Sequence, residues 1–95
     1  MEITSSANTI EITGNIKSIS DFSKIKSLID GVIATHKSVS IHIVDSLSIT
    51  SSVIGYFNKI ILKDKINIDM RVGNQQLMDL IDDLSLTSTF KARKA

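Results

Sequence analysis

Hydrophobic and polar residues alternate at the start of the chain. Ile10 and Ile12 share one side of an extended segment, while Glu11 and Thr13 face the other way. The segment Glu2-Ile3-Thr4 repeats the pattern in a shorter form, and Ala7-Asn8 suits a tight turn between the two. The pattern predicts an N-terminal hairpin with strands near residues 2–5 and 9–13.

Three later segments carry the period of an amphipathic helix instead. The first helix is predicted over 20–35, with Ser20 or Asp21 as its N-cap. The second is predicted over 52–63, and the third carries Leu77, Leu80, Ile81 and Leu84 on one face. Alternating segments over 39–44 and 66–71 predict two more strands between these helices.

The predicted order is ββαβαβα, which is typical of an α/β fold with at least some parallel strands and right-handed crossovers. We expect a small mixed sheet of about four strands with about three helices packed against it. The 95 residues allow one domain, over 1–95. The basic residues Lys91, Arg93 and Lys94 are expected to form a frayed, solvated tail over 91–95; an anion-binding or partner-binding tail is the alternative.

Composition excludes several classes of protein. Hydrophobic residues make up 42% of the chain, which excludes disorder, and the absence of cysteine excludes disulfides and thiolate metal sites. No apolar run approaches the ~20 residues of a membrane span, and no signal peptide is recognisable, so we expect a cytoplasmic protein without membrane insertion. Eleven basic and ten acidic residues are interspersed without a basic stripe, which argues against nucleic acid as a partner.

Signatures of catalysis and of cofactor binding are missing from the sequence. The four glycines are isolated, so no phosphate-binding loop is present. His36 and His42 lack the spacing of a helical metal pair, and Asp79, Asp82 and Asp83 are typical of a solvated acidic face. No nucleophile is accompanied by a base. The sequence therefore predicts a non-enzymatic protein with no cofactor and no metal, and a small-ligand binder or enzyme has only the generality of the fold to support it.

The polar stretch before the second helix is the main candidate for function. Thr50, Ser51 and Ser52 lie where the exit loop of a strand becomes a helix N-terminus, a place that favours anions. A phosphate there would add about 1.5 to 2 negative charges. Simple helix capping by a hydroxyl explains the same residues, and both interpretations stay open at this point.

These residues resemble the STAS domain, the family that includes the bacterial anti-sigma factor antagonists. The similarity lies in Ile41-His42-Ile43-Val44, a short polar loop, Ile49-Thr50-Ser51-Ser52-Val53-Ile54-Gly55 and the helix that follows. The strand over 66–71, the helix through Leu77 and the segment Leu84–Phe90 are similar to the second half of that family. The family signature is Asp-Ser-Ser/Thr-Gly, an apolar residue and Gly; here Thr50 replaces the Asp, Val53 replaces a Gly, and Gly55 is kept.

The resemblance implies a switch protein that binds a histidine-kinase-like serine kinase, which is also an anti-sigma factor. The phosphorylated serine would be Ser51; Ser46 is the alternative, since Asp45-Ser46 keeps the Asp-Ser pair of the signature. Contacts with the partner are expected from the loop over 45–52 and the exposed side of the second helix: Asp45, Ser46, Ser48, Thr50, Ser52, Val53, Tyr56 and Lys59. Some relatives lack the phosphorylation cycle, so the alternative is an adaptor subunit of a membrane-associated lipid or anion transport complex. The sequence leaves the oligomeric state open.

Overall fold

A single mixed sheet of five strands organises the computed structural model, which describes residues 1–95. The strands are β1 (Glu2–Ser6), β2 (Thr9–Thr13), β3 (Ser38–Ile43), β4 (Asn67–Val72) and β5 (Ala92–Lys94). The helices are α1 (Ile19–Ile33), α2 (Ser51–Leu62), α3 (Gln75–Asp83) and α4 (Thr87–Phe90). The expected α/β class is confirmed, with one strand and one helix more than the sequence predicted.

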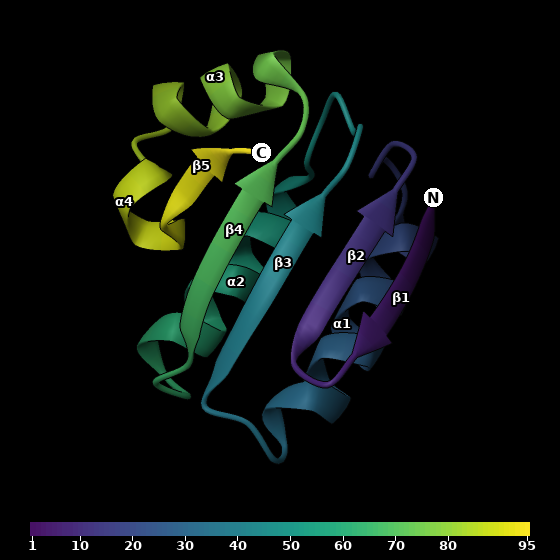
Figure 1. The fold of residues 1–95 in the computed structure, drawn as a ribbon, viewed down its shortest axis with the longest axis vertical. Coiled ribbons are helices and arrows are strands. Elements are labelled where there is room, and N and C mark those ends of the chain that lie inside the picture. Colours follow the sequence, from purple (N-terminus) through teal and green to yellow (C-terminus); the bar gives the residue numbers. More distant parts are fainter.

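The order of strands in the sheet is the order of strands in the chain, β1-β2-β3-β4-β5 (Figure 1). β1 pairs antiparallel with β2, as the predicted hairpin requires, and every later pair is parallel. The carboxyl ends of β2, β3 and β4 therefore meet at one end of the sheet. The loops that leave these strands lead into α1, α2 and α3.

One face of the sheet is apolar and covered, and the other is polar and open. α1 and α2 lie behind the sheet in Figure 1 and bury the alternating side chains of β2, β3 and β4. The core on this side consists mainly of isoleucine and includes Ile10, Ile12, Ile41, Ile43, Ile25, Ile29, Phe57 and Ile60. Every second residue of these strands, and about every 3.6th residue of these helices, is thus buried, as the hydrophobic pattern predicted.

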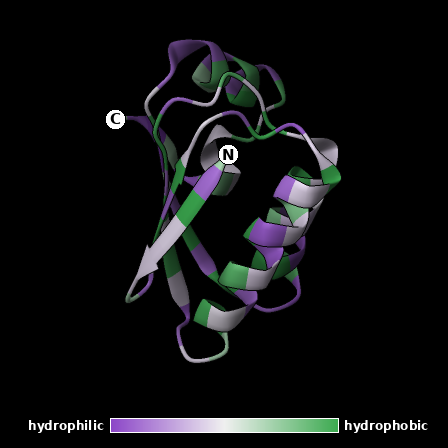
Figure 2. Cartoon of the chain, turned by 90° about the vertical axis from the view of Figure 1, so that its right-hand side faces the viewer, coloured by the Kyte–Doolittle hydropathy of each residue, from purple (hydrophilic) through white to green (hydrophobic).

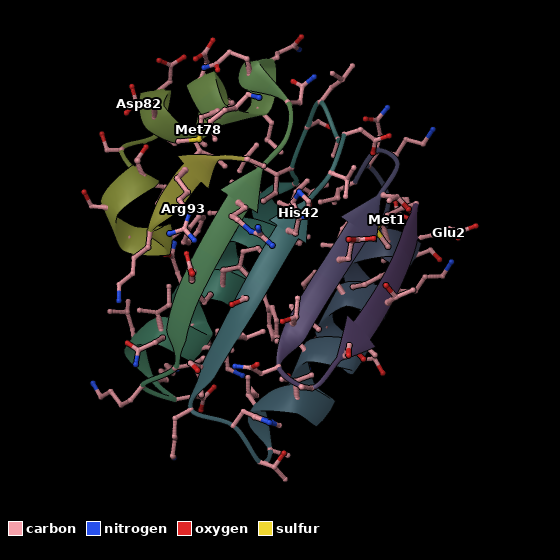
Figure 3. The ribbon with its side chains drawn as sticks, in the orientation of Figure 1. Met1, Glu2, His42, Met78, Asp82 and Arg93 are labelled. Atoms are coloured by element: carbon pink, nitrogen blue, oxygen red, sulfur yellow. The ribbon has the colours of Figure 1, made fainter.

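The open face carries a row of polar side chains in register across the strands. Thr4, Glu11, His42, Arg71 and Arg93 pair in turn from β1 to β5. Glu11 Oε2 lies 3.8 Å from His42 Nδ1, and Arg93 Nη1 lies 3.3 Å from Asp69 Oδ1. His42 and Arg93 are labelled on this face in Figure 3. Parallel sheets usually have both faces covered, so this solvated face, which is made almost wholly of polar residues, is unusual.

The C-terminal residues differ from the expected frayed tail. Ala92–Lys94 form β5, whose Ala92 is buried and pairs with Met70 of β4, and the Ala95 N–H donates to the Val72 carbonyl. Phe90, which precedes β5, is fully buried with its ring 5.7 Å from that of Phe57. The aromatic anchor and the unpaired edge of β4 together hold a segment whose charged composition favours solvent.

The first helix also begins earlier than predicted. Its N-cap is Ser18, not Ser20 or Asp21, and its last residue is Ile33. Asp21 occupies the third helical position, where its carboxylate bonds back to the start of the helix. None of the four helices combines the length and the apolarity that spanning a membrane requires.

Candidate functional site

The predicted site lies where the exits of β2 and β3 meet the N-termini of α1 and α2. This is the carboxyl end of the parallel strands, where α/β sheets usually place ligands and partners. Two loops build it, residues 14–18 after β2 and residues 44–50 after β3. Gly73, at the exit of β4, is packed so tightly that a Cβ there would come 2.0 Å from the Val44 carbonyl oxygen. The base of the 44–50 loop is therefore fixed by the neighbouring strand.

Side chains tie the two loops together. Asp45 Oδ1 accepts from the Gly14 N–H at 2.7 Å, and Ser48 Oγ donates to the Ile16 carbonyl at 3.0 Å. In the other direction, Asn15 Oδ1 accepts from the Leu47 N–H at 2.9 Å. Asp45 and Ser48, both predicted to contact a partner, thus hold the loops in place.

Ser46 is fully buried at the centre of this network. Its Oγ accepts from the Ile16 N–H at 3.0 Å and the Ser48 N–H at 3.3 Å, and donates to the Ser48 carbonyl at 2.7 Å. A phosphate on this oxygen would break all three bonds and would not fit the closed loop. The geometry therefore disfavours Ser46 as the alternative acceptor, and Ser46 does not reach the surface to contact a partner.

The start of α2 exposes two hydroxyls. Thr50 is the N-cap, and its Oγ1 accepts from the Val53 N–H at 3.3 Å, so capping is performed by Thr50 alone. Ser51 and Ser52 follow as the first two helical residues; both are exposed, and neither side chain is hydrogen-bonded within the protein. The first turn of α2 contains no acidic residue. Its free N–H groups and the positive end of its dipole therefore lack a negative partner.

The start of α1 lies beside the start of α2 across a small hollow of about 120 Å³. The hollow is lined by Lys17, Ser18, Ile19, Phe22, Thr50 and Ser52. Lys17 and the positive ends of two helices surround it, which makes its surroundings favourable to a negative charge. The sequence pattern did not single out Lys17, because the residue comes near α2 only through the fold.

Unlike α2, α1 supplies its own negative charge. Ser18 Oγ accepts from the Asp21 N–H, and Asp21 Oδ2 accepts from the N–H groups of Lys17 and Ser18 at 3.0 and 3.2 Å. The hydrogen bond from the Lys17 N–H is the main reason that the pKa of Asp21 lies below its usual value. The N–H groups of Lys17, Ser18 and Asp21 are thus occupied, and a carboxylate already stands at this helix end.

The start of α1 and the 44–50 loop each carry an exposed apolar side chain that was not predicted. Ile19 is 83% exposed at the first position of α1, and Leu47 is 44% exposed in the 44–50 loop. Ile19 falls outside the apolar stripe of α1, which is the only sequence signal that could have identified it. Ile19 lines the hollow together with Thr50 and Ser52, the two chain neighbours of the candidate serine.

Besides Ser46, two more residues of the predicted contact set are in the interior, contrary to expectation. Val53 is fully buried and Tyr56 is 4% exposed, because both belong to the hydrophobic core. The Tyr56 hydroxyl donates to Asp30 Oδ1 at 2.6 Å, and Lys26 Nζ lies 2.7 Å from Asp30 Oδ2. These bonds link α2 to α1. Lys59, by contrast, is exposed on α2 as predicted.

This link perturbs both of its acidic groups. Burial by itself would raise the pKa of Asp30, but hydrogen bonds from Lys26 and Tyr56 bring it below its usual value. Burial, followed by the hydrogen bond to Asp30, raises the pKa of Tyr56 far above its ordinary value. With both shifts the phenol stays neutral and the carboxylate stays ionised, which are the forms that this hydrogen bond joins.

The remaining titratable groups form no further centre. No three His, Asp or Glu side chains gather closely enough to hold a metal ion. His42 lies on the open face and His36 at the end of α1, where its ring nitrogen is 3.1 Å from the Val32 carbonyl oxygen. Asp79, Asp82 and Asp83 are exposed on α3.

Comparison with known proteins gives no further identification. No family model matches this chain, and no curated protein and no solved structure matches it. The function is therefore inferred from the residues of the site and their arrangement.

Proposed function

We propose that this protein is a non-enzymatic, STAS-like switch that binds a serine kinase with anti-sigma activity and is released from it when Ser51 is phosphorylated. The observation that carries the proposal is the start of α2, where Ser51 is exposed, free of hydrogen bonds and placed on a helix end that has no acidic residue. A phosphate on Ser51 would supply the missing negative charge. It would also change the charge of the surface that the start of α2 presents to a partner.

The two departures from the family signature leave this arrangement possible. Thr50 takes the cap position in place of the family's Asp and accepts the bond from the Val53 N–H. Val53, in place of a Gly, turns into the core and adds nothing to the outer surface. Gly55 faces open space on the same helix, with no atom within 4 Å of a Cβ built there. Glycine in a helix costs about 1 kcal/mol relative to alanine, so its presence here calls for a compensating role. Without a side chain at Gly55, a partner can approach the backbone of α2 closely.

The kinase reaction tests the proposal directly. The purified protein is incubated with ATP and a candidate serine kinase encoded near its gene, and the product is examined by intact and fragment mass spectrometry. We expect one phosphate on Ser51, no phosphate on Ser51→Ala, and normal uptake by Ser20→Ala, an exposed serine in the first turn of α1. Uptake by Ser51→Ala at another residue would disprove the assignment of the site.

A second candidate is an adaptor that uses the same surface without phosphorylation, in a membrane-associated transport complex. The feature that favours it is Thr50, because no carboxylate stands beside Ser51. Binding of Ser51→Asp separates the two functions. The switch requires weaker binding of this variant to the kinase than of Ser51→Ala, whereas the adaptor requires that a transport ATPase copurify equally with both.

A further inference from the structure

The strand β1 forms an open edge of the sheet. The Ser40 N–H donates to the Asn8 carbonyl, and the Val44 N–H donates to the Ile12 carbonyl. The backbone N–H and C=O groups of the even-numbered residues of β2 therefore point toward β3, and those of its odd-numbered residues point toward β1. Glu2, Thr4 and Ser6 pair with these odd-numbered residues, so their backbone N–H and C=O groups point toward β2. The alternation of an antiparallel ladder then directs the N–H and C=O groups of Ile3 and Ser5 away from the sheet.

This edge has none of the features that usually prevent strand addition. β1 is five residues long, pairs with β2 without a bulge, and contains neither Lys nor Pro. Its one charge is Glu2, at one end, and in Figure 2 the hydrophilic colour on β1 is confined to that end. Natural proteins blunt a free edge with charges, bulges or short strands. The opposite edge follows that rule, because β5 has only three residues and two of them are the exposed Arg93 and Lys94.

The space beside β1 is also open on the helix side of the sheet. A groove of about 540 Å³ runs between Ile3 and the flank of α1. Its lining is made of small or flexible side chains around two apolar ones: Ile3, Ser20, Ser23, Lys24, Ser27, Leu28 and Gly31. A strand added to β1 would direct every second side chain into this groove.

We propose that the occupant is a second copy of this chain, joined through antiparallel pairing of the two β1 strands about a two-fold axis at Thr4. This register pairs all five residues of the strand and brings Ile3 opposite Ser5 of the second copy. These are the residues whose backbone groups point outward, so the required hydrogen bonds can form. The ten strands then make one continuous sheet.

Charge and shape are compatible with this self-pairing. Each Glu2 lies opposite Ser6 of the second copy, so the two carboxylates do not face one another. The two grooves become one shared cavity whose floor carries both Ile3 side chains. The small residues Ser20, Ser27 and Gly31 leave room between the two α1 helices. Neither β1 nor the lining of the groove includes Ser51, so the proposal is independent of the proposed function.

Sedimentation of the purified full chain over a range of concentrations tests the proposal. We expect a dimer that dissociates on dilution, and Thr4→Lys should raise the dissociation constant by about tenfold or more, because two like charges would face each other at the axis. In the monomer the same lysine lies opposite Glu11, which favours folding. Asn67→Lys is the matched control; it adds the same charge to the same face at β4 and should leave the dimer unchanged.

A cysteine at the axis tests the register. The chain has no cysteine, and residues directly opposite in such a pair have Cα atoms about 4.5 Å apart, within the range of a disulfide. Thr4→Cys should form a covalent dimer on mild oxidation, whereas Ser6→Cys, on the same face of β1, should not. A monomer at all concentrations, or a dimer unaffected by Thr4→Lys, would overturn the proposal and indicate that β1 pairs with a foreign strand or with none.

Discussion

The starts of α1 and α2 lie side by side, yet they are completed in different ways. At α1, Ser18 and Asp21 bond the first N–H groups reciprocally, and Asp21 brings a negative charge to the end of the helix. At α2, Thr50 makes one bond of 3.3 Å, and the first turn has no acid. Each start follows the exit of a parallel strand, so the difference is one of sequence and not of position in the fold.

This difference separates a structural helix end from one that can respond to a ligand or a modification. The end of α1 is electrostatically complete, so an added phosphate would meet the carboxylate of Asp21. The end of α2 has the same dipole without a fixed counter-charge, and Lys17 adds a cation to the hollow between the two helices. Only the N-terminus of α2 therefore favours a negative charge that can be added and removed, such as a phosphate.

The largest effect is expected from the residue that holds both starts in place. Ser46→Ala removes three hydrogen bonds and leaves the buried Ile16 N–H without a partner, which should lower the free energy of unfolding by about 2 kcal/mol. Chemical denaturation measures the loss. Ser48→Ala, which removes the single bond from its hydroxyl to Ile16, is the control and should cost about half as much. Equal losses would contradict the central role of Ser46.

The two caps should differ in strength. Ser18→Ala should lower the free energy of unfolding by about 1 kcal/mol, and Thr50→Ala by about 0.5 kcal/mol, because the bond at Thr50 is longer and stands alone. Thermal denaturation of the two variants gives the ranking. A larger loss for Thr50→Ala would show that α2 depends on its cap more than α1 does.

An added negative charge should distinguish the two helix ends directly. Ser51→Asp should raise the free energy of unfolding by about 0.5 kcal/mol, because it interacts with an end that lacks a counter-charge. Ser20→Asp makes the same change next to Asp21 and should give no gain. Both positions are exposed in the monomer, so at concentrations below the dissociation constant of the proposed dimer side-chain burial does not confuse the comparison. If both variants gain equally, the idea that α1 is already satisfied is wrong.

The smallest effect concerns acid. The pKa of Asp21 is lower in the folded protein than the ordinary value of 3.8, so its contribution to stability is present above that pH. The contribution is lost as the pH falls below about 3.8 through the pKa of the folded state. Asp30 behaves in the same way, so Asp21→Asn should weaken the acid dependence without abolishing it. Melting temperatures between pH 2 and 6 provide the measurement.

The sequence predicted those elements whose residues repeat with a strict period. The alternation around Ile10 and Ile41 and the helical spacing around Ile25 and Phe57 reflect burial against one core, so β2, β3, α1 and α2 were found. β5 was missed because Ala92–Lys94 is short and basic, and only the free edge of β4 makes it a strand. The cap of α1 was misplaced because Ser18, Ser20 and Asp21 all suit that role; the reciprocal bonds decide among them.

The candidate site was predicted in its position but not in its composition. Ser51 lies at the predicted helix start, since the change of period after residue 50 marks it. Tyr56 was wrongly predicted to lie on the surface, because its polar hydroxyl is typical of an exposed residue. Its partner Asp30 lies 26 residues away in the chain and comes within hydrogen-bond distance only when α1 and α2 pack together. Lys17 and Ile19 were missed for the same reason.

The agreement between strand order and chain order has a consequence for synthesis on the ribosome. Each strand pairs with the one made just before it, and no strand has to insert between two that are already joined. The β1–β2 hairpin can form first, and each helix and strand that follows can add to the existing edge as it emerges. The C-terminal strand β5 is the last to be released and the last to pair. Until β5 pairs, the growing chain therefore exposes an unpaired strand edge at every stage. β5 then covers the edge of β4 and leaves a short edge that carries Arg93 and Lys94.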